Sequence, residues 1–254
     1  MKLEETYLDA FNDLKASLEI ASLNPQDAIS LIDLTLLNEF ASDEELIMLG
    51  KKANLHQVAA ICVMPEQLKK IALSSTIKRA TVVNFPKGFL SDKELLADLD
   101  TILTNYQPDE IDYVFPYQTY LEGEEKVALS QCKQAYKLCQ QKGATFKVIL
   151  ETGALPSLEI IYKISTEVIN SGCDFLKTST GKIAEGATLA SAFTILKAIK
   201  DSKIPCGLKV SGGLKTAEQA FSYMILAKQT LGFNLEKSWF RIGASSLLNE
   251  LINH

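Results

Sequence analysis

Two lysines interrupt otherwise apolar segments in the second half of the chain. Lys177 lies in DFLKTSTGK (174–182) and Lys209 in GLKVSGG (207–213). A lysine with the ordinary pKa of about 10.4 is protonated at neutral pH and is a poor nucleophile. If the two segments are neighbouring strands, each ammonium disfavours protonation of the other, so one of them can be a free amine. A free amine attacks a carbonyl to form a Schiff base, whose iminium accepts electrons and permits carbon–carbon cleavage without a metal.

Other charged residues interrupt apolar segments in the same way. Asp112 lies within EIDYVFPY and could accept or relay a proton, directly or through water. Asp33 lies within SLIDLTLL, and Lys147 and Glu151 lie within FKVILETG. A buried charge is costly unless it is paired or lies near a functional site, and an ion pair between Asp112 and Lys147 is the structural alternative. Several such charges near the carboxyl ends of strands favour a functional site.

Clusters of small and hydroxylated residues follow three of the apolar segments. Backbone amides, glycines and hydroxyls of this kind hold phosphate at strand ends and helix starts. Any one cluster is equally typical of a turn, but all three at the ends of successive segments predict a phosphate site. The clusters are Ser179-Thr180-Gly181-Lys182, Ser211-Gly212-Gly213 and Gly243-Ala244-Ser245-Ser246.

The elements that must position these residues alternate along the chain. Each of eight short apolar segments is followed by an amphipathic stretch, such as 42–53, 122–143 or 216–232, long enough to be a helix. The segments are apolar on both faces, which is typical of parallel strands covered by helices. This pattern predicts an α/β fold, a single (β/α)₈ TIM barrel, with strands within 28–37, 58–64, 79–85, 110–116, 146–152, 173–179, 206–212 and 240–246.

An open doubly wound sheet has the same alternation. It would require a GxGxxG motif after the first strand, and LIDLTLLNEF has none. An extra amphipathic helix over roughly 3–21 precedes the first strand. We therefore expect one domain over 1–254, in which residues 1–27 cap the bottom of the barrel.

Composition excludes several classes of function. A net charge of -5 disfavours nucleic-acid binding, and no stretch reaches 18 apolar residues, so we expect neither a nucleic-acid nor a membrane partner. The beginning, MKLEETYLDAF, is acidic where a signal peptide is basic, so a cytoplasmic location is expected. Five cysteines without CxxC spacing and two histidines, His56 and His254, indicate neither a disulfide framework nor a metal site. Cys62 could face the barrel interior as an inert buried thiol or near a substrate.

The same segments carry a family resemblance. DLTLLN, AAICVMP, ATVVNFPKG, EIDYVFPY, KVILETG, DFLKTSTGK, GLKVSGG and FRIGASSLL resemble, in order, the strand motifs of the deoxyribose-phosphate aldolase family across residues 28–250. The resemblance implies a class I, metal-independent lyase without a cofactor that acts in deoxyribonucleoside catabolism. Such an enzyme reversibly cleaves 2-deoxy-D-ribose 5-phosphate to acetaldehyde and D-glyceraldehyde 3-phosphate, and the family is commonly dimeric.

The resemblance also implies roles for individual residues. Lys177 would form the Schiff base, Lys209 would depress its pKa, and Asp112 would handle proton transfer with a water. The remaining residues implied to surround the substrate or its phosphate are Asp33, Thr35, Cys62, Lys147, Thr180, Gly181, Lys182, Gly212, Gly213, Gly243, Ser245 and Ser246.

Two departures from the family pattern bear on these expectations. Many relatives have proline and alanine where this chain has Val210 and Ser211, a change that leaves Lys209 and the following glycines in place. Some relatives also carry a tail ending in a tyrosine that assists a proton transfer. In this chain we expect Asp112, Lys209 and water to carry out that transfer. The alternatives are another Schiff-base sugar-phosphate aldolase, a transaldolase-like barrel, or an inactive barrel that only binds a sugar phosphate.

Overall fold

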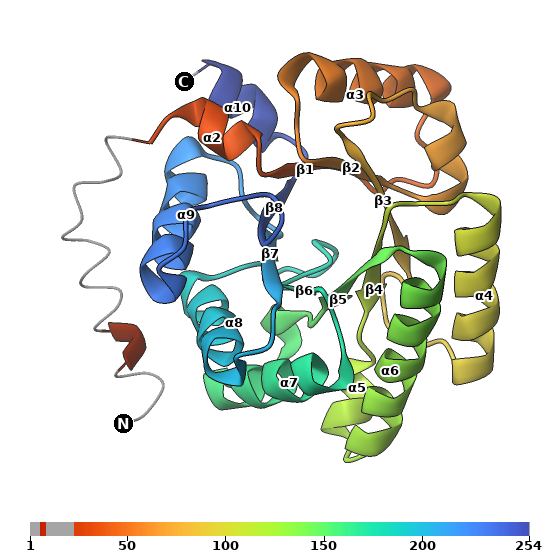
Figure 1. Ribbon diagram of the computed structural model, residues 1–254, viewed down its shortest axis with the longest axis vertical. Helices are drawn as coiled ribbons and strands as arrows, with labels where there is room; N and C mark the ends of the chain where they lie inside the picture. The colour runs from red at the N-terminus through yellow and green to blue at the C-terminus, as the bar shows by residue number, and fades with distance from the viewer. Residues whose placement is uncertain (1–5, 9–22, 254) are drawn as a thin grey trace.

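Eight parallel strands close into a barrel in sequence order, and helices surround it (Figure 1). The computed structural model describes residues 6–8 and 23–253. The architecture confirms the (β/α)₈ barrel expected from the alternating pattern. The strands are β1 (Ile32–Leu36), β2 (Ala60–Val63), β3 (Lys78–Val83), β4 (Glu110–Val114), β5 (Thr145–Ile149), β6 (Phe175–Lys177), β7 (Gly207–Ser211) and β8 (Phe240–Ala244).

The helices begin and end at residues suited to those positions. Ser42 and Ser91 cap the starts of α3 and α4, each accepting a hydrogen bond from the backbone N–H of a glutamate three residues later. Gly143 and Gly232 end α6 and α9 in the left-handed conformation. The helices are α2 (Pro25–Ile29), α3 (Asp43–His56), η2 (Pro65–Lys70), α4 (Asp92–Asn105), α5 (Tyr117–Leu121), α6 (Glu125–Lys142), η3 (Thr152–Ala154), α7 (Leu158–Ser171), α8 (Leu189–Ser202), α9 (Ala217–Leu231) and α10 (Leu247–Asn253).

Two local features were not predicted from the sequence. The first apolar segment, 28–37, does not begin as a strand, because its first two residues end the short helix α2. Asn24 caps α2 and Pro25 occupies its first position, which explains why a helix forms there. After β2 the chain forms the 3-10 helix η2, not an α-helix, since only a short segment separates β2 from β3.

The expected N-terminal helix over 3–21 lies mostly outside the described residues. Residues 6–8 are helical, and the ring of Tyr7 lies 6.0 Å from the ring of Phe193 on α8. The short helix α2 packs against α9 and α10, which places it beside the C-terminal helix (Figure 1). Within the described ranges, no helix is both long and apolar enough to cross a membrane.

The barrel interior has an apolar part and an ionic part. Cys62, Ala80 and Val82, from β2 and β3, form a small buried apolar cluster. Strands β1 and β4 to β8 instead contribute buried charged side chains. A separate and much larger apolar core, rich in leucine, isoleucine and valine, fills the space between the strands and the helices. The strands are therefore held from outside by apolar packing, which leaves their inner faces free to carry charge.

Candidate active site

The barrel register places the two lysines of the sequence prediction side by side. Lys177 on β6 is paired with Lys209 on β7, and Asp112 on β4 is paired with Lys147 on β5. Side chains at paired positions of parallel strands point to the same face of the sheet. Both lysines therefore lie at the same depth of the barrel, as expected from their positions in the two motifs.

Lys177 and Lys209 share one carboxylate oxygen. The Nζ of Lys177 donates to Oδ2 of Asp112 at 2.8 Å, and the Nζ of Lys209 donates to the same oxygen at 2.7 Å. Lys209 also lies 2.6 Å from Oδ2 of Asp33. Both lysines are almost completely buried. The arrangement brings the amines close together while giving Lys209 two carboxylates and Lys177 one.

The ion pair between Asp112 and Lys147, the structural alternative considered from the sequence, is also present. Lys147 Nζ donates to Oδ1 of Asp112 at 2.9 Å and lies 2.5 Å from Oε2 of Glu110. It is fully buried and does not contact the cavity described below. Lys147 therefore holds one oxygen of the Asp112 carboxylate, while Lys177 and Lys209 share the other.

Two buried members of this ionic network, Glu110 and Arg241, were not predicted from the sequence. Arg241 on β8 donates to Asp33 at 2.6 Å and to Glu110 at 2.9 Å, and all three side chains are buried. The signal was present, because Glu110 and Arg241 are charged residues within apolar strands like the others. Three carboxylates (Asp33, Glu110 and Asp112) therefore face four cationic side chains (Lys147, Lys177, Lys209 and Arg241) in the interior.

The surroundings separate the pKa values of the two lysines. Burial lowers the pKa of Lys177, and the charge of Lys209 adds to this lowering against the opposing effect of Asp112. Burial would also lower the pKa of Lys209, but Asp112 and Asp33 outweigh it and raise that pKa above its ordinary value. Of the four cationic side chains, Lys177 is the one whose pKa the surroundings lower, whereas the pKa values of Lys147, Lys209 and Arg241 are raised.

A cavity of about 280 Å³ opens at the carboxyl ends of the strands. Of the four cationic side chains in the ionic network, Lys177 alone lines it. Asp33, Cys62, Asp112, Lys147 and Lys209 lie below the lining and do not form part of it. The other predicted site residues line the cavity: Thr35, Thr180, Gly181, Lys182, Gly212, Gly213, Gly243, Ser245 and Ser246.

The three small-residue clusters converge around this cavity. Gly212 and Gly213 have φ angles of +87° and +86°, which glycine adopts without strain. A Cβ on Gly213 would meet nothing within 4 Å, so its backbone is open to the cavity. Lys182 reaches across the rim and donates to the carbonyl of Leu37 at 2.8 Å. Lys215, which the sequence prediction did not include, adds a further cation to the lining.

Two predicted site residues have structural partners of their own. Thr180 donates its hydroxyl and its backbone N–H to the carboxylate of Glu151, at 2.5 Å and 3.1 Å, which fixes the loop after β6. Cys62 is fully buried, and its Sγ lies 3.9 Å from Oδ2 of Asp112. Burial, together with the charge of Asp112, raises the pKa of the Cys62 thiol to about 11, so it is a neutral group in the barrel interior.

Comparison with known proteins identifies the family. The sequence profile of the DeoC/LacD family aldolases matches residues 27–251. The chain belongs to the DeoC/LacD aldolase family. It is 38% identical over 232 residues to a deoxyribose-phosphate aldolase from Agrobacterium fabrum, a match that covers 89% of each chain.

Solved structures share the fold of this DeoC/LacD aldolase. The aldolase QR15 superposes with a TM-score of 0.76 at 25% identity, over 89% of this chain and 96% of that one. A tetrameric deoxyribose phosphate aldolase from Aeropyrum pernix superposes with a TM-score of 0.73 at 23% identity, over 91% of each chain. The barrel is thus the fold of the aldolases it resembles.

Proposed function

We propose that this DeoC/LacD aldolase cleaves 2-deoxy-D-ribose 5-phosphate reversibly to acetaldehyde and D-glyceraldehyde 3-phosphate, with Lys177 as the Schiff-base residue. One observation carries the assignment. Among the four cationic side chains of the network, Lys177 alone lines the cavity, and burial and Lys209 both favour its free-amine form. The similarity to the Agrobacterium fabrum enzyme supports the choice of substrate.

The free amine of Lys177 attacks the aldehyde carbon of the open-chain sugar, and the resulting carbinolamine loses water to give an iminium. Lys209 supplies the proton that leaves with this water, because its ammonium lies beside Lys177 on the same oxygen of Asp112. Asp112 accepts hydrogen bonds from the Nζ atoms of both lysines, so its carboxylate can carry a proton from one lysine to the other. The network thus places a proton donor and a proton acceptor next to the nucleophile.

The iminium then draws electrons from the bond between C2 and C3 of the sugar. A water held by Asp112 and Lys209 removes the proton of the C3 hydroxyl, the bond breaks, and D-glyceraldehyde 3-phosphate leaves. The remaining enamine takes a proton at C2, and hydrolysis releases acetaldehyde and the free amine of Lys177. Each step uses only side chains and water, so activity is expected to persist after exhaustive chelation of metals.

The clusters at the ends of β6, β7 and β8 are proposed to hold the phosphate. Lys182, Ser245 and Ser246 are exposed and line the same cavity as Lys177, together with the open backbone of Gly213. Backbone amides, hydroxyls and an ammonium are a suitable donor set for a dianion. Anchoring the phosphate at the rim would present the other end of the sugar to the amine of Lys177.

The wider setting is also a proposal. A role in deoxyribonucleoside catabolism follows from the proposed substrate. A cytoplasmic location is supported by the five cysteines, whose spacing is not that of a disulfide framework. A homodimer is proposed from the common state of the resembled family, although the Aeropyrum pernix relative is tetrameric.

Reductive trapping tests the assignment of Lys177. Incubation with acetaldehyde and borohydride should reduce the imine to a secondary amine, add one ethyl group to Lys177 and inactivate the enzyme. Lys177→Ala should lose labelling and turnover together, whereas Lys93→Ala, which removes an exposed lysine on α4, should lose neither. Labelling at Lys147 or Lys209, or turnover in Lys177→Ala, would refute the assignment.

Donor profiling distinguishes the remaining alternatives. The proposed enzyme should form a carbon–carbon bond with acetaldehyde as donor and should not use dihydroxyacetone. Preference for dihydroxyacetone would indicate a transaldolase-like or other sugar-phosphate aldolase. Binding of the sugar phosphate without any turnover would indicate an inactive barrel.

A further inference from the structure

Two cysteines lie in contact at the end of the barrel opposite the lysine cavity. Cys173 precedes β6 and Cys206 precedes β7, and their Sγ atoms are 3.7 Å apart. The neighbouring backbones are fixed, since Gly207 donates its N–H to the carbonyl of Asp174 at 2.8 Å. A disulfide needs its sulfurs about 2.05 Å apart on backbones that already lie close together. A small rotation of the two side chains would therefore suffice to join them.

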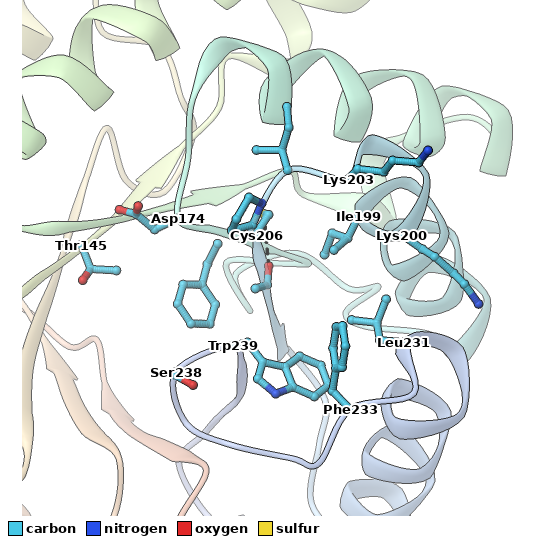
Figure 2. Close-up of a pocket in the computed structure, with 14 residues that line it drawn as sticks. Thr145, Asp174, Ile199, Lys200, Lys203, Cys206, Leu231, Phe233, Ser238 and Trp239 are labelled. Carbon is cyan, nitrogen blue, oxygen red and sulfur yellow. Dashed lines mark hydrogen bonds between the residues drawn. The ribbon is translucent and has the colours of Figure 1, made fainter.

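A pocket gives access to one of these thiols. It has a volume of about 700 Å³ and is larger than the cavity at Lys177. Cys206 lines it near the centre of the residues drawn in Figure 2, together with Trp239 and Phe233. All five cysteines lie in the described part of the chain, and Cys206 is the one that is not buried. Cys173 is 5% exposed and lies behind it, outside the pocket lining.

We propose that Cys206 and Cys173 form a dithiol modification site that is converted to an intramolecular disulfide by a small peroxide entering this pocket. This site is independent of the aldolase reaction. Cys206 is the thiol that reacts first, because the pocket exposes it, and Cys173 is the resolving thiol. The hydrogen bond with Cys206, together with burial, raises the pKa of Cys173, which keeps Cys173 protonated until its neighbour has been oxidised.

The reaction uses hydrogen peroxide as the oxidant. The sulfur of Cys206 attacks one peroxide oxygen, the O–O bond breaks, and the products are a sulfenic acid and one water. The sulfur of Cys173 then attacks the sulfenic sulfur, the S–S bond forms, the S–O bond breaks, and a second water leaves with the remaining thiol proton. Two thiols are oxidised by two electrons, and one peroxide is reduced to two waters.

The disulfide would join the amino ends of the two strands that carry Lys177 and Lys209. It would close a loop between residues 33 positions apart, and such a link restricts the unfolded chain. Lys177 is the last residue of β6 and Lys209 is the middle residue of β7, and the two strands are already paired from Phe175 and Gly207 onward. We therefore expect a rise of several degrees in melting temperature and a change in turnover of less than about twofold.

Peptide mapping tests the site. The full-length protein is treated with hydrogen peroxide, blocked with N-ethylmaleimide and digested with trypsin without reduction. The expected product is peptide 164–177 joined to peptide 204–209 through Cys173 and Cys206, and dithiothreitol should separate the two. Cys139→Ser is the matched control, since it removes a buried thiol on α6 that is outside the pair, and it should form the same product.

Single variants test the order of the two steps. Cys173→Ser should stop at a sulfenic acid on Cys206 that dimedone captures, whereas Cys206→Ser should leave Cys173 as a free thiol. Phenylarsine oxide tests the geometry without an oxidant: one arsenic should bind per wild-type chain with both thiols protected, and neither single variant should retain it. Oxidation of Cys206 to a sulfinic acid while Cys173 stays free, or failure of Cys206 to react, would overturn the proposal.

Discussion

Gly243 leaves no room for a side chain beside Lys209. A Cβ placed on Gly243 would lie 3.0 Å from Cε of Lys209 and 2.9 Å from Cβ of Ser211. Real Cβ atoms rarely approach other atoms so closely. The absence of a side chain at Gly243 therefore allows the Lys209 ammonium to reach the carboxylates of Asp33 and Asp112.

Gly243→Ala should consequently reduce turnover while the barrel stays folded. Displacing a proton donor by about 1 Å costs up to about 100-fold in rate, so we expect kcat to fall by about 10- to 100-fold. Gly50→Ala is the matched control, because Gly50 lies on α3, where its Cβ would be 2.7 Å from the side chain of Ile71 and away from the network of Lys177 and Lys209. Steady-state kinetics should show an unchanged kcat for Gly50→Ala, and an equal loss in both variants would assign the effect to general misfolding.

Lys209→Leu should shift the pH profile to alkaline values. Burial and then Lys209 lower the pKa of Lys177, so removing Lys209 raises that pKa towards its ordinary value. The free-amine fraction at neutral pH falls about tenfold for each unit of rise, and part of the activity returns as the pH approaches the new pKa. Inactivity at every pH would instead indicate loss of a direct proton transfer, and an unchanged profile would reject both roles of Lys209.

Ser246→Glu should weaken the use of phosphorylated substrates selectively. The new carboxylate would stand beside the proposed phosphate, and repulsion at a partly exposed site is worth about tenfold or more in KM. Ser246→Gln introduces a side chain with nearly the same shape as glutamate but without its charge, and it should have a much smaller effect. The comparison is kcat/KM for 2-deoxyribose 5-phosphate against unphosphorylated 2-deoxyribose, and equal losses for the two sugars would place the phosphate elsewhere.

Arg241→Met should destabilise the barrel in a pH-dependent way. The substitution removes the guanidinium that bonds both Asp33 and Glu110 and leaves these buried carboxylates to the lysines alone, for which a loss of about 3 to 5 kcal/mol in unfolding free energy is expected. Arg79→Met, which removes an arginine bonded to the carbonyl of Leu68 on η2, should cost much less.

The sign of this pH dependence follows from Asp33. Burial would raise its pKa, but Lys209 and Arg241 outweigh burial and hold the pKa below its ordinary value. Asp33 therefore contributes stability above about pH 4, the ordinary range of its unfolded pKa, and this contribution is lost as the pH falls through the folded pKa. The gap between wild type and Arg241→Met, measured by urea unfolding, should be widest above pH 4 and narrow below it.

The fold and the main lysines could be predicted from the sequence because both depend on local pattern. Alternation of apolar segments and helices predicts a barrel, and each motif contains its lysine three or four residues before a glycine. Glu110 and Arg241 were missed because each lies near the start of its strand. A charged residue at that position is also typical of the loop that precedes a strand. Their contact with one another needs the closed barrel, which brings residues 131 positions apart together.

Other details depend on packing that sequence patterns do not record. The 3-10 helix η2 reflects the short connection between β2 and β3, and periodicity alone did not distinguish it from an α-helix. Cys173 and Cys206 carry no spacing signal, and their contact results from the pairing of β6 with β7. The difference in pKa direction between Lys177 and Lys209 likewise depends on Asp33, whose carboxylate lies 2.6 Å from Lys209.

The lining of the lysine cavity gives the molecule a local field opposite to its overall charge. The chain carries a net charge of -5, yet among the described residues of this lining the charged side chains beside the amine of Lys177 are Lys182 and Lys215, without an acidic one. A recess with one sign of charge and low-dielectric walls focuses field lines and steers oppositely charged molecules towards it. Salt screens this attraction over about 8 Å at physiological ionic strength. Encounter with a dianionic sugar should therefore slow as salt is added, whereas encounter with an uncharged sugar should not.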